Sequence, residues 1–500
     1  MAGEHVDVLI VGAGVSGIGA ACHLRRECPG KSYAILERRT AIGGTWDLFR
    51  YPGIRSDSDM FTFGYRFRPW LDMKVLADGT SIRHYVEETA AEYGVTEHIR
   101  FGLKVLRANW SSTEKRWSVE ALREETGEVE RYTCDFLLGC TGYYNYDTGY
   151  RPDFPGEDRF RGDVVHPQHW PEDLDYQGKR VVVIGSGATA VTLIPAMVDE
   201  AAHVTMLQRS PTYIVTVPAT DALSAALQKV LPTKAVYQLA RGRNVALQRL
   251  LYSAARRFPN AVRKIILAGV RHQVGPDVDM RHFTPHYDPW DQRLCIVPNG
   301  DLFRVVRSGT ASVVTDHIET FTEDGIRLES GEHLDADVII TATGLDVQMM
   351  GGAEVSVDED PVVLRDRLAY KSVMVGDVPN AALVFGYVNA SWTLKADIAC
   401  DYVCRLLNYM DEHGHRVAVA RQNGAEYAEE SVLSALNAGY VRRGQTELPR
   451  QGVKAPWRVS NNYFSDIPLL RLAPIDDGVL TFDPVAPDAA VADEETAAAS

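Results

Sequence analysis

Two glycine-rich turns have the spacing of dinucleotide-binding loops. The first, GAGVSG at residues 12–17, follows an apolar run and opens a segment with helical periodicity. Its glycines allow a tight turn and let the backbone approach a pyrophosphate, whose charge is stabilised at a helix N-terminus. Glu37, further along, is placed to accept hydrogen bonds from both ribose hydroxyls and to repel a 2′-phosphate. The pattern predicts an FAD or NAD site, whose contact residues in the turn are Gly12, Gly14, Ser16 and Gly17.

The second turn is GSGATA at residues 185–190, with alanine in the third glycine position. Where the first turn is followed by an acid, this one is followed by Gln208, Arg209 and Ser210. A guanidinium beside a hydroxyl suits a 2′-phosphate, so the pattern predicts NADPH. The residues predicted to contact it are Gly185, Ser186, Gly187, Ala188, Thr189, Ala190, Arg209 and Ser210.

Two such sites in one chain define a flavoprotein in which the nicotinamide delivers hydride to the flavin. The seven cysteines contain no CxxC pair, which argues against a disulfide reductase, and their odd number favours reduced thiols. No metal site is predicted, because structural zinc usually shows closely spaced Cys and His pairs. The fate of the electrons, transfer to oxygen or to a separate acceptor, is left open by these motifs.

The elements that must position the two turns are strand–helix–strand units. The first is predicted as a strand at 6–11, a helix at 16–26 and a strand at 32–37; a similar unit starts at Arg180. Between them, NWSSTEKRWSVEAL alternates as an antiparallel hairpin does. The runs DFLLGCTG and DVIITATG end alike in Thr-Gly, and we take them as crossing points between two domains.

The predicted fold class is α/β, with two Rossmann-like dinucleotide-binding domains and a helical insertion. Residues 222–276 read as two or three helices with ten Lys or Arg and no Asp or Glu, which predicts a solvated face, a contact with anionic lipid or steering of an anionic cofactor. The expected domains are an FAD-binding domain at 1–145 and 378–483, an NADPH-binding domain at 150–218 and 291–377, the helical insertion at 219–290 and a disordered tail at 484–500.

The net charge and the apolar runs of the chain limit the classes of partner that it can bind. A net charge of −15 argues against a general nucleic-acid binder, since neutralising phosphates needs clustered positive charge. The first apolar run lacks a basic flank and is too short to span a bilayer. We therefore expect a cytoplasmic protein with small-molecule partners and at most peripheral membrane contact; the oligomeric state is left open.

A stretch ahead of the second turn carries a family resemblance. FRGDVVHPQHWP matches the pattern FxGxxxHxxxW(P/D) of Baeyer–Villiger monooxygenases through Phe160, Gly162, His166, Trp170 and Pro171. The related flavin-containing monooxygenases share the Phe, Gly and His but lack the Trp-Pro ending. A second family pattern fits GTWDLFRYPGIRSD, and in NASWTLKAD the chain looks closest to the ethionamide-activating mycobacterial subgroup.

The resemblance covers nearly the whole chain up to the tail, and it implies the cofactor contacts and the activity. FAD contacts at Gly44, Thr45, Trp46, Asp57 and Val105, and an NADPH contact at Arg55, are expected. Such enzymes reduce FAD with NADPH, form a flavin C4a-peroxide with O2 and convert a ketone to an ester or lactone; oxidation of thioethers or thiocarbonyls is also expected. The alternatives are a flavin-containing S- or N-monooxygenase and an NADPH oxidase or electron-transfer reductase.

Catalytic roles follow from the same resemblance. Arg293 lies where the family places an arginine that stabilises negative charge beside the flavin, and Asp57 matches the carboxylate that holds it. Gln292 stands where many members have a lysine that helps to bind the 2′-phosphate. We expect His166 to form hydrogen bonds with the backbone. Trp170 and Pro171 are expected to pack between the two domains at their junction. In the late loop, Trp457 and Tyr463 contact NADP or substrate, or only anchor the loop.

Overall fold

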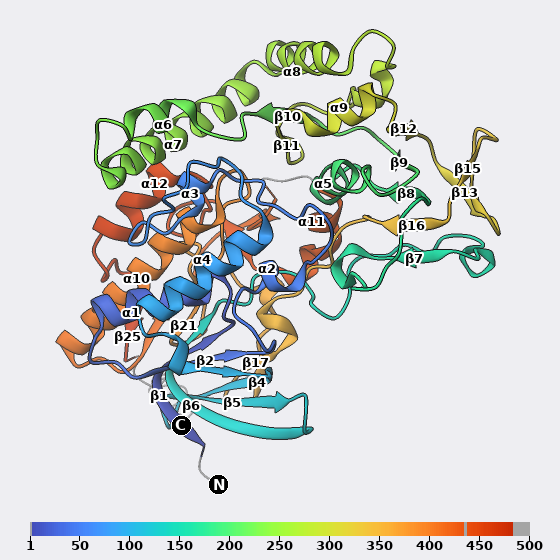
Figure 1. The fold of residues 1–500 in the computed structure, drawn as a ribbon. Helices are drawn as coiled ribbons and strands as arrows, with labels where there is room; N and C mark the ends of the chain where they lie inside the picture. Colours follow the sequence, from blue (N-terminus) through green and yellow to red (C-terminus); the bar gives the residue numbers. More distant parts are fainter. Residues whose placement is uncertain (1–2, 435–437, 484–500) are drawn as a thin grey trace, which may run out of the picture.

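The larger of the two main sheets holds the first glycine turn. The computed structural model describes residues 3–434 and 438–483, so the predicted tail lies outside the described residues. In the eleven-stranded sheet, β1 (Glu4–Val11) lies between β2 (Tyr33–Glu37) and β6 (Glu128–Gly139), all parallel. Helix α1 (Val15–Glu27) connects β1 to β2, which confirms the predicted unit (Figure 1). The continuous apolar runs of these strands suit a sheet covered on both faces.

The predicted hairpin forms the antiparallel part of this sheet. Strands β4 (Leu103–Ser111) and β5 (Arg116–Arg123) pair antiparallel, and Trp110 faces Trp117 with ring centroids 5.8 Å apart. Both indoles are buried, which fixes the register of the hairpin. Further elements of this unit are β3 (Ile99–Phe101), α2 (Thr45–Leu48), α3 (Met60–Phe63), α4 (Gly79–Glu92), α10 (Trp392–His413), β22 (Ala418–Ala420), β23 (Tyr427–Ser431), α11 (Gly439–Arg443), β24 (Arg450–Gly452), α12 (Tyr463–Ile467) and β25 (Leu480–Phe482).

The second sheet holds the second glycine turn. It is parallel, in the order β12-β9-β8-β16-β7, and its strands are β7 (Asp163–Val165), β8 (Arg180–Ile184), β9 (His203–Gln208), β12 (Ala311–Thr315) and β16 (Val338–Thr341). Helix α5 (Ala188–Met197) connects β8 to β9, as predicted. Beside this sheet lie β10 (Ile214–Val217), β11 (Cys295–Pro298), α9 (Asp301–Arg307), β13 (Ile318–Phe321), β14 (Gly325–Leu328) and β15 (His333–Asp335).

The chain returns to the first sheet earlier than predicted. Strand β17 (Glu354–Val357) pairs in parallel with β4, and β21 (Ala381–Leu383) pairs with β6. The predicted boundary at 378 is therefore wrong for residues 354–377, which also hold β18 (Asp360–Pro361), β19 (Ala369–Tyr370) and β20 (Met374–Val375). A four-residue strand is too short to give a periodic signal. We propose that the first unit resumes at Glu354, with the other domain limits as predicted.

The helical insertion consists of three helices. They are α6 (Ala222–Leu227), α7 (Thr233–Arg257) and α8 (Pro259–Val274), which lie along the upper edge of the molecule in Figure 1. Arg241 anchors α7, because its guanidinium donates hydrogen bonds to the carbonyl oxygens of Phe61 (2.9 Å) and Gly64 (2.7 Å). The insertion is thus bonded to the first unit beside α3. Among the described residues, the helices are all too short or too polar to cross a bilayer.

Candidate active site

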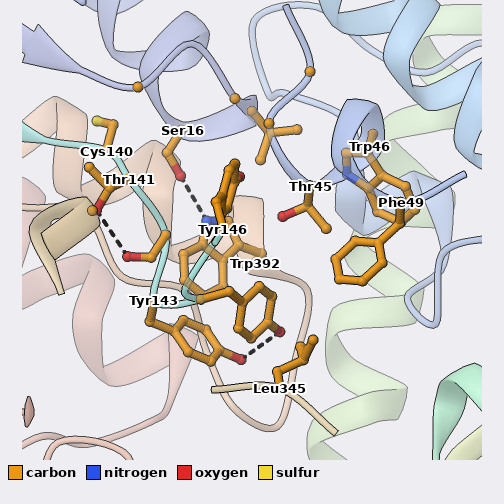
Figure 2. Close-up of a pocket in the computed structure, with 18 of the residues that line it drawn as sticks. Ser16, Thr45, Trp46, Phe49, Cys140, Thr141, Tyr143, Tyr146, Leu345 and Trp392 are labelled. Carbon is orange, nitrogen blue, oxygen red and sulfur yellow. Dashed lines mark hydrogen bonds between the residues drawn. The ribbon is translucent and has the colours of Figure 1, made fainter. Parts of the chain in front are cut away.

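A cavity of about 310 Å³ lies where the two units meet. Its walls come from the first glycine turn, the ends of β2 and β6, the segment 43–58 and the N-terminus of α5 (Figure 2). This is the position, beyond the carboxyl ends of parallel strands, where α/β proteins bind ligands. The predicted site residues that line it are Gly12, Gly14, Ser16, Glu37, Gly44, Thr45, Trp46, Arg55, Asp57, Val105, Ala188, Thr189 and Arg293. Those outside the lining are Gly17, Gly185, Ser186, Gly187, Ala190, Arg209 and Ser210.

The first turn admits no side chains at its ends. Gly12 has a φ of +103°, and a Cβ there would lie 2.8 Å from the carbonyl oxygen of Cys140. A Cβ at Gly17 would lie 1.8 Å from the carbonyl oxygen of Gly12. The backbone itself therefore forms the cradle in front of α1, as close approach of a pyrophosphate requires.

Glu37 is held by the backbone at the cavity wall. It is only 4% exposed, and its carboxylate accepts hydrogen bonds from the amides of Ala13 (2.6 Å) and Arg39 (2.8 Å). Burial raises its pKa. Each oxygen keeps a free lone pair, so the geometry suits a ribose diol.

Arg293 and Asp57 form an ion pair inside the cavity. The guanidinium Nη2 donates to Asp57 Oδ1 at 2.8 Å, and the side chain of Arg293 is still 36% exposed. The negative charge of Asp57 is the main reason why the pKa of Arg293 is raised. The arginine is therefore a fixed cation that faces the ligand space.

Arg55 has unsatisfied donors. Its Nη1 donates to Asp301 Oδ2 at 2.6 Å, whereas Nε and Nη2 are buried with no hydrogen-bond partner in the protein. Leaving buried donors unpaired is costly, particularly on a charged group. An anionic group in the cavity, such as a phosphate, would satisfy them, so the residues present fit a dinucleotide.

The second turn is as tight as the first at its opening glycine, because a Cβ at Gly185 would lie 2.3 Å from the carbonyl oxygen of Ala342, but it is open further on. A Cβ at Gly187 would meet no atom within 4 Å, and Arg209 and Ser210 are exposed. Gln208 is buried and donates to the carbonyl oxygen of His282 at 2.7 Å, so it has a structural role. The sequence analysis did not single out Arg443, which is a further cation near Arg209. Burial lowers the pKa of Arg443, and the charges of Arg442 and Arg209 lower it further.

The linker between the sheets is fixed by backbone contacts. His166 Nε2 lies 3.3 Å from the carbonyl oxygen of Gly344, and its Nδ1 accepts from the amide of Gln168 at 3.2 Å. Burial lowers the pKa of His166. Trp170 packs against the core of the second unit, whereas Phe160 packs against Phe321 on the other face of that sheet. A Cβ at Gly162 would lie 2.2 Å from the carbonyl oxygen of Asp337, and Pro171 is half-buried.

Of the two roles expected for Trp457, the structure favours the anchor of the loop over a cofactor contact. Trp457 is 7% exposed and packs edge-on against Tyr370, at 5.5 Å between centroids, so it is a core residue away from the cavity. Tyr463 packs beside Tyr387, which lines the cavity, so it remains a neighbour of the site.

The sequence analysis missed an aromatic wall. Trp392 donates from Nε1 to Ser16 Oγ at 2.8 Å and stacks on Tyr143 at 5.5 Å, and the hydroxyl of Tyr144 donates to that of Tyr143 at 3.0 Å (Figure 2). Burial raises the pKa of Tyr143 and Tyr144, so both keep their protons at neutral pH. The tyrosines of this wall could have been found from the motif GYYNY, which directly follows the first crossing point between the domains. Its last residue, Tyr146, also lines the cavity.

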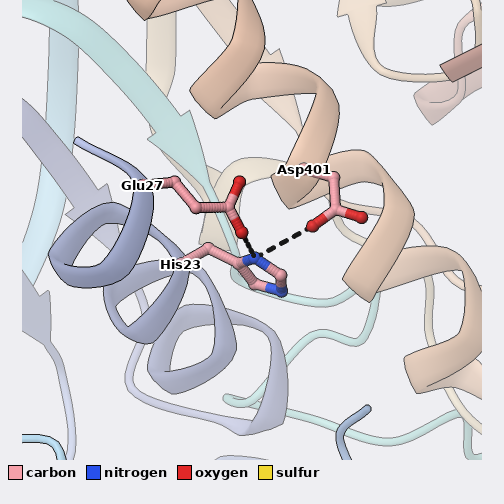
Figure 3. Close-up of side chains that lie close together, drawn as sticks. All are labelled: His23, Glu27 and Asp401. Carbon is pink, nitrogen blue, oxygen red and sulfur yellow. Dashed lines mark hydrogen bonds and ion pairs between the residues drawn. The ribbon is translucent and has the colours of Figure 1, made fainter. Parts of the chain in front are cut away.

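One group of possible metal ligands occurs among the described residues, away from this cavity. His23 Nδ1 lies 3.0 Å from Glu27 and 3.1 Å from Asp401, and its Nε2 lies 2.8 Å from Asp397 (Figure 3). Arg471 also pairs with Asp401. These two cations offset two of the three acidic charges, so we interpret the cluster as an ionic link between α1 and α10. All seven cysteines are free thiols, as predicted, and all are buried.

Comparisons with known proteins agree with this arrangement. A profile for flavin-binding monooxygenase-like proteins matches residues 72–389, and one for an NAD(P)-binding Rossmann-like domain matches residues 10–73. The chain is 58% identical over 493 residues to MymA of Mycobacterium tuberculosis, described as an FAD-containing monooxygenase (98% of this chain, all of that one). It is 54% identical to the FAD-containing monooxygenase EthA of the same organism (96% of this chain, 98% of that one).

Solved structures share the fold. A steroid monooxygenase bound to NADP superposes with a TM-score of 0.70 at 24% identity, over 83% of this chain and 88% of that chain. An open structure of cyclohexanone monooxygenase superposes with a TM-score of 0.70 at 23% identity, over 83% and 90% of the two chains. At these identities the likeness establishes the arrangement of two dinucleotide-binding units.

Proposed function

Because the chain belongs to the flavin-binding monooxygenase-like family, we propose that this flavoprotein monooxygenase is an FAD- and NADPH-dependent Baeyer–Villiger enzyme. It converts a ketone, O2, NADPH and a proton to an ester or lactone, NADP+ and water. The observation that carries the proposal is the Arg293–Asp57 pair in a cavity bounded by the first glycine turn and the N-terminus of α5.

Each cofactor has its own set of residues. The FAD diphosphate would lie on the turn that contains Gly12 and Gly14, with its ribose on Glu37. NADPH would approach from the second turn, with Arg209 at its 2′-phosphate and the unpaired donors of Arg55 at an anionic oxygen. Bound FAD would accept hydride from NADPH and activate O2.

The chain's own contribution is a fixed charge and a shaped space. Arg293 stays protonated, and Asp57 holds it in one place. It would stabilise the negative charge that develops on the attacking oxygen and on the substrate carbonyl oxygen. The aromatic wall of Tyr143 and Trp392 favours apolar ketones and restricts water. Thioethers and thiocarbonyls, which need no rearrangement, would be oxidised in the same space.

The linker supports this reaction over simple S- or N-oxygenation. Flavin-containing monooxygenases lack the Trp170-Pro171 ending, and here Trp170 packs against the core of the second unit. We propose that His166, bonded to Gly344, transmits NADPH docking to the flavin site. We further propose a cytoplasmic location and small-molecule substrates.

The test separates reduction from oxygenation. We expect the Arg293→Ala variant to retain FAD and anaerobic reduction by NADPH while ester formation falls at least a hundredfold, since removing one stabilising donor costs about 2.7–4 kcal/mol in the barrier. Arg293→Lys, which retains a charge, should recover part of the yield. The measurements are stopped-flow absorbance and mass spectrometry with a ketone and sulfide panel. Normal ester yield in the alanine variant would remove the proposed role, and sulfoxide as the only wild-type product would assign the enzyme to S-oxygenation.

A further inference from the structure

The helical insertion concentrates exposed apolar side chains. Of the sixteen large apolar side chains exposed among the described residues, nine fall within residues 223–265. These nine are Leu223, Val230, Leu231, Leu239, Leu247, Leu250, Leu251, Phe258 and Ile265. The most exposed on the two long helices are Ile265 at 72% and Leu250 at 65%. Scattered exposed leucines need no explanation, but such a concentration on one structural element does.

These side chains follow helical spacing. Leu247, Leu250 and Leu251 are three and four residues apart, so they share one side of α7. Val245 lies on the opposite side of this part of the helix and is buried. Ala240 lies seven and eleven residues before Leu247 and Leu251, on their side of the helix, and is buried in the core of the first unit, so the leucines continue as an exposed stripe what is packed earlier in the helix. Because Arg241 is bonded to three backbone carbonyls of the first unit, α7 has no freedom to turn the leucines inward.

Positive charge accompanies the apolar side chains. Residues 222–276 contain ten Lys or Arg and no acid, in a protein whose net charge is −15. No carboxylate of the described residues lies within ion-pair distance of Lys229, Lys234, Arg249, Arg257 or Lys264. Arg257 lies over the ring of Phe258, 5.9 Å from its centroid, so cation and aromatic are interleaved at the corner between α7 and α8.

We propose that α6, α7 and α8 form a docking surface for an anionic lipid bilayer. Apolar side chains next to unpaired Lys and Arg, with acids excluded, are the composition of helices that lie in a membrane interface. The leucines and Phe258 would enter the acyl boundary while the basic side chains reach the lipid phosphates. The same face packed symmetrically against a second copy would oppose like charges, which disfavours a two-fold dimer.

Docking would not depend on the oxygenation chemistry. The outward face of α7 meets lipid, and its inward face meets the first unit through Val245, which packs against Tyr387. The catalytic pair Arg293 and Asp57 is no part of the proposed surface. The proposal can therefore fail or succeed independently of the proposed function.

The experiment is flotation of the FAD-loaded full chain with vesicles. We expect binding to phosphatidylcholine vesicles that contain phosphatidylglycerol, little binding to phosphatidylcholine alone, and a strong decrease at high salt, because screening shortens the range of the charges to about 3 Å at 1 M. The double variant Leu250→Glu/Ile265→Glu should lose at least tenfold in affinity. The control Leu472→Glu/Val129→Glu makes the same charge change at side chains that are 75% and 49% exposed elsewhere, and it should bind as wild type does.

A second pair of variants tests the charges. Arg257→Gln/Lys264→Gln should weaken binding by about fivefold per residue, whereas Arg131→Gln/Arg161→Gln should not. FAD absorbance and NADPH-dependent flavin reduction report that each variant is folded. Equal binding of the surface and control variants, equal binding to neutral and anionic vesicles, or absence of binding would overturn the proposal. So would self-association in sedimentation that the surface variants abolish, because it would assign this face to a second copy of the chain.

Discussion

The two glycine turns have the same spacing but different surroundings. In the first, Gly17 is pressed against the carbonyl of Gly12, and Glu37 is buried on backbone amides. In the second, the third position is Ala190, whose Cβ is accommodated at 0% exposure, and the space around Gly187 is open. A closed cradle suits a cofactor that stays bound, and an open one suits a cofactor that exchanges in every turnover. The sequence motif alone does not distinguish these two uses.

The helices that follow the two turns also differ in how firmly they are held. Helix α1 is tied to α10 by His23, which contacts Glu27, Asp397 and Asp401. Helix α5 has no ionisable side chain at all and is held by apolar packing. We infer that the first unit is the rigid half, since buried charges with satisfied partners restrict the helices that carry them.

The largest expected effect is at the first turn. Gly12→Ala places a Cβ at positive φ and 2.8 Å from a carbonyl oxygen, so we expect a loss of about 2–5 kcal/mol in the free energy of unfolding and purification without FAD. The measurements are chemical denaturation and the flavin absorbance per chain.

The contrasting variant is made at the second glycine of the other turn, because the first glycine there, Gly185, is as restricted as Gly12, with a φ of +136° and a Cβ that would lie 2.3 Å from the carbonyl oxygen of Ala342. This contrasting variant is Gly187→Ala. Because nothing lies within 4 Å of the added Cβ, stability and FAD content should be unchanged, and only the KM for NADPH should rise. Equal losses of FAD in the two variants would contradict the contrast between a closed and an open turn.

An intermediate effect is expected at His23. Burial lowers its pKa, but the hydrogen bonds to Asp397, Asp401 and Glu27 outweigh burial and hold the pKa well above the ordinary value. The stabilisation by charged His23 is thus complete below the pKa of the unfolded chain and is lost as pH rises through the folded pKa. His23→Gln should cost about 3 kcal/mol at mildly acidic pH and less at alkaline pH, measured as Tm against pH.

The control for this experiment is His84→Gln. His84 also contacts a carboxylate, Glu88 at 2.9 Å, but its side chain is 69% exposed. The His84→Gln variant should therefore have the same pH profile of Tm as the wild type. A constant difference between wild type and His23→Gln across pH would show that His23 is not charged in the native protein.

The smallest expected effect is at the 2′-phosphate side of the open turn. Arg209 is exposed, and we expect Arg209→Ala to raise the KM for NADPH about tenfold, with the KM for NADH and the FAD content unchanged. Arg209→Lys should lose less, and Arg161→Ala, an exposed arginine of the same unit paired with Glu323, should change neither KM. An equal rise for both nucleotides would show that Arg209 does not read the phosphate.

Local patterns predicted much of the fold. Both strand–helix–strand units, the tryptophan hairpin and the helical character of the basic insertion follow from periodicity and turn residues within short windows. Strand β17, which lies between β18 and β4, escaped prediction because it is short and β4 lies far away in the chain. Resemblance to a family loop left two roles open for Trp457, a cofactor contact or an anchor, and only its distant packing partner Tyr370 decides for the anchor.

By itself, the sequence determined which chemistry the chain can host. Glycines at fixed spacing, an acid after one turn and an arginine after the other depend only on backbone geometry and charge, and these are properties of a few neighbouring residues. Tertiary structure alone decided which distant groups meet. Arg293 joins Asp57, Trp392 joins Ser16 and the tyrosines close the wall, because parallel sheets bring together segments that the chain keeps hundreds of residues apart.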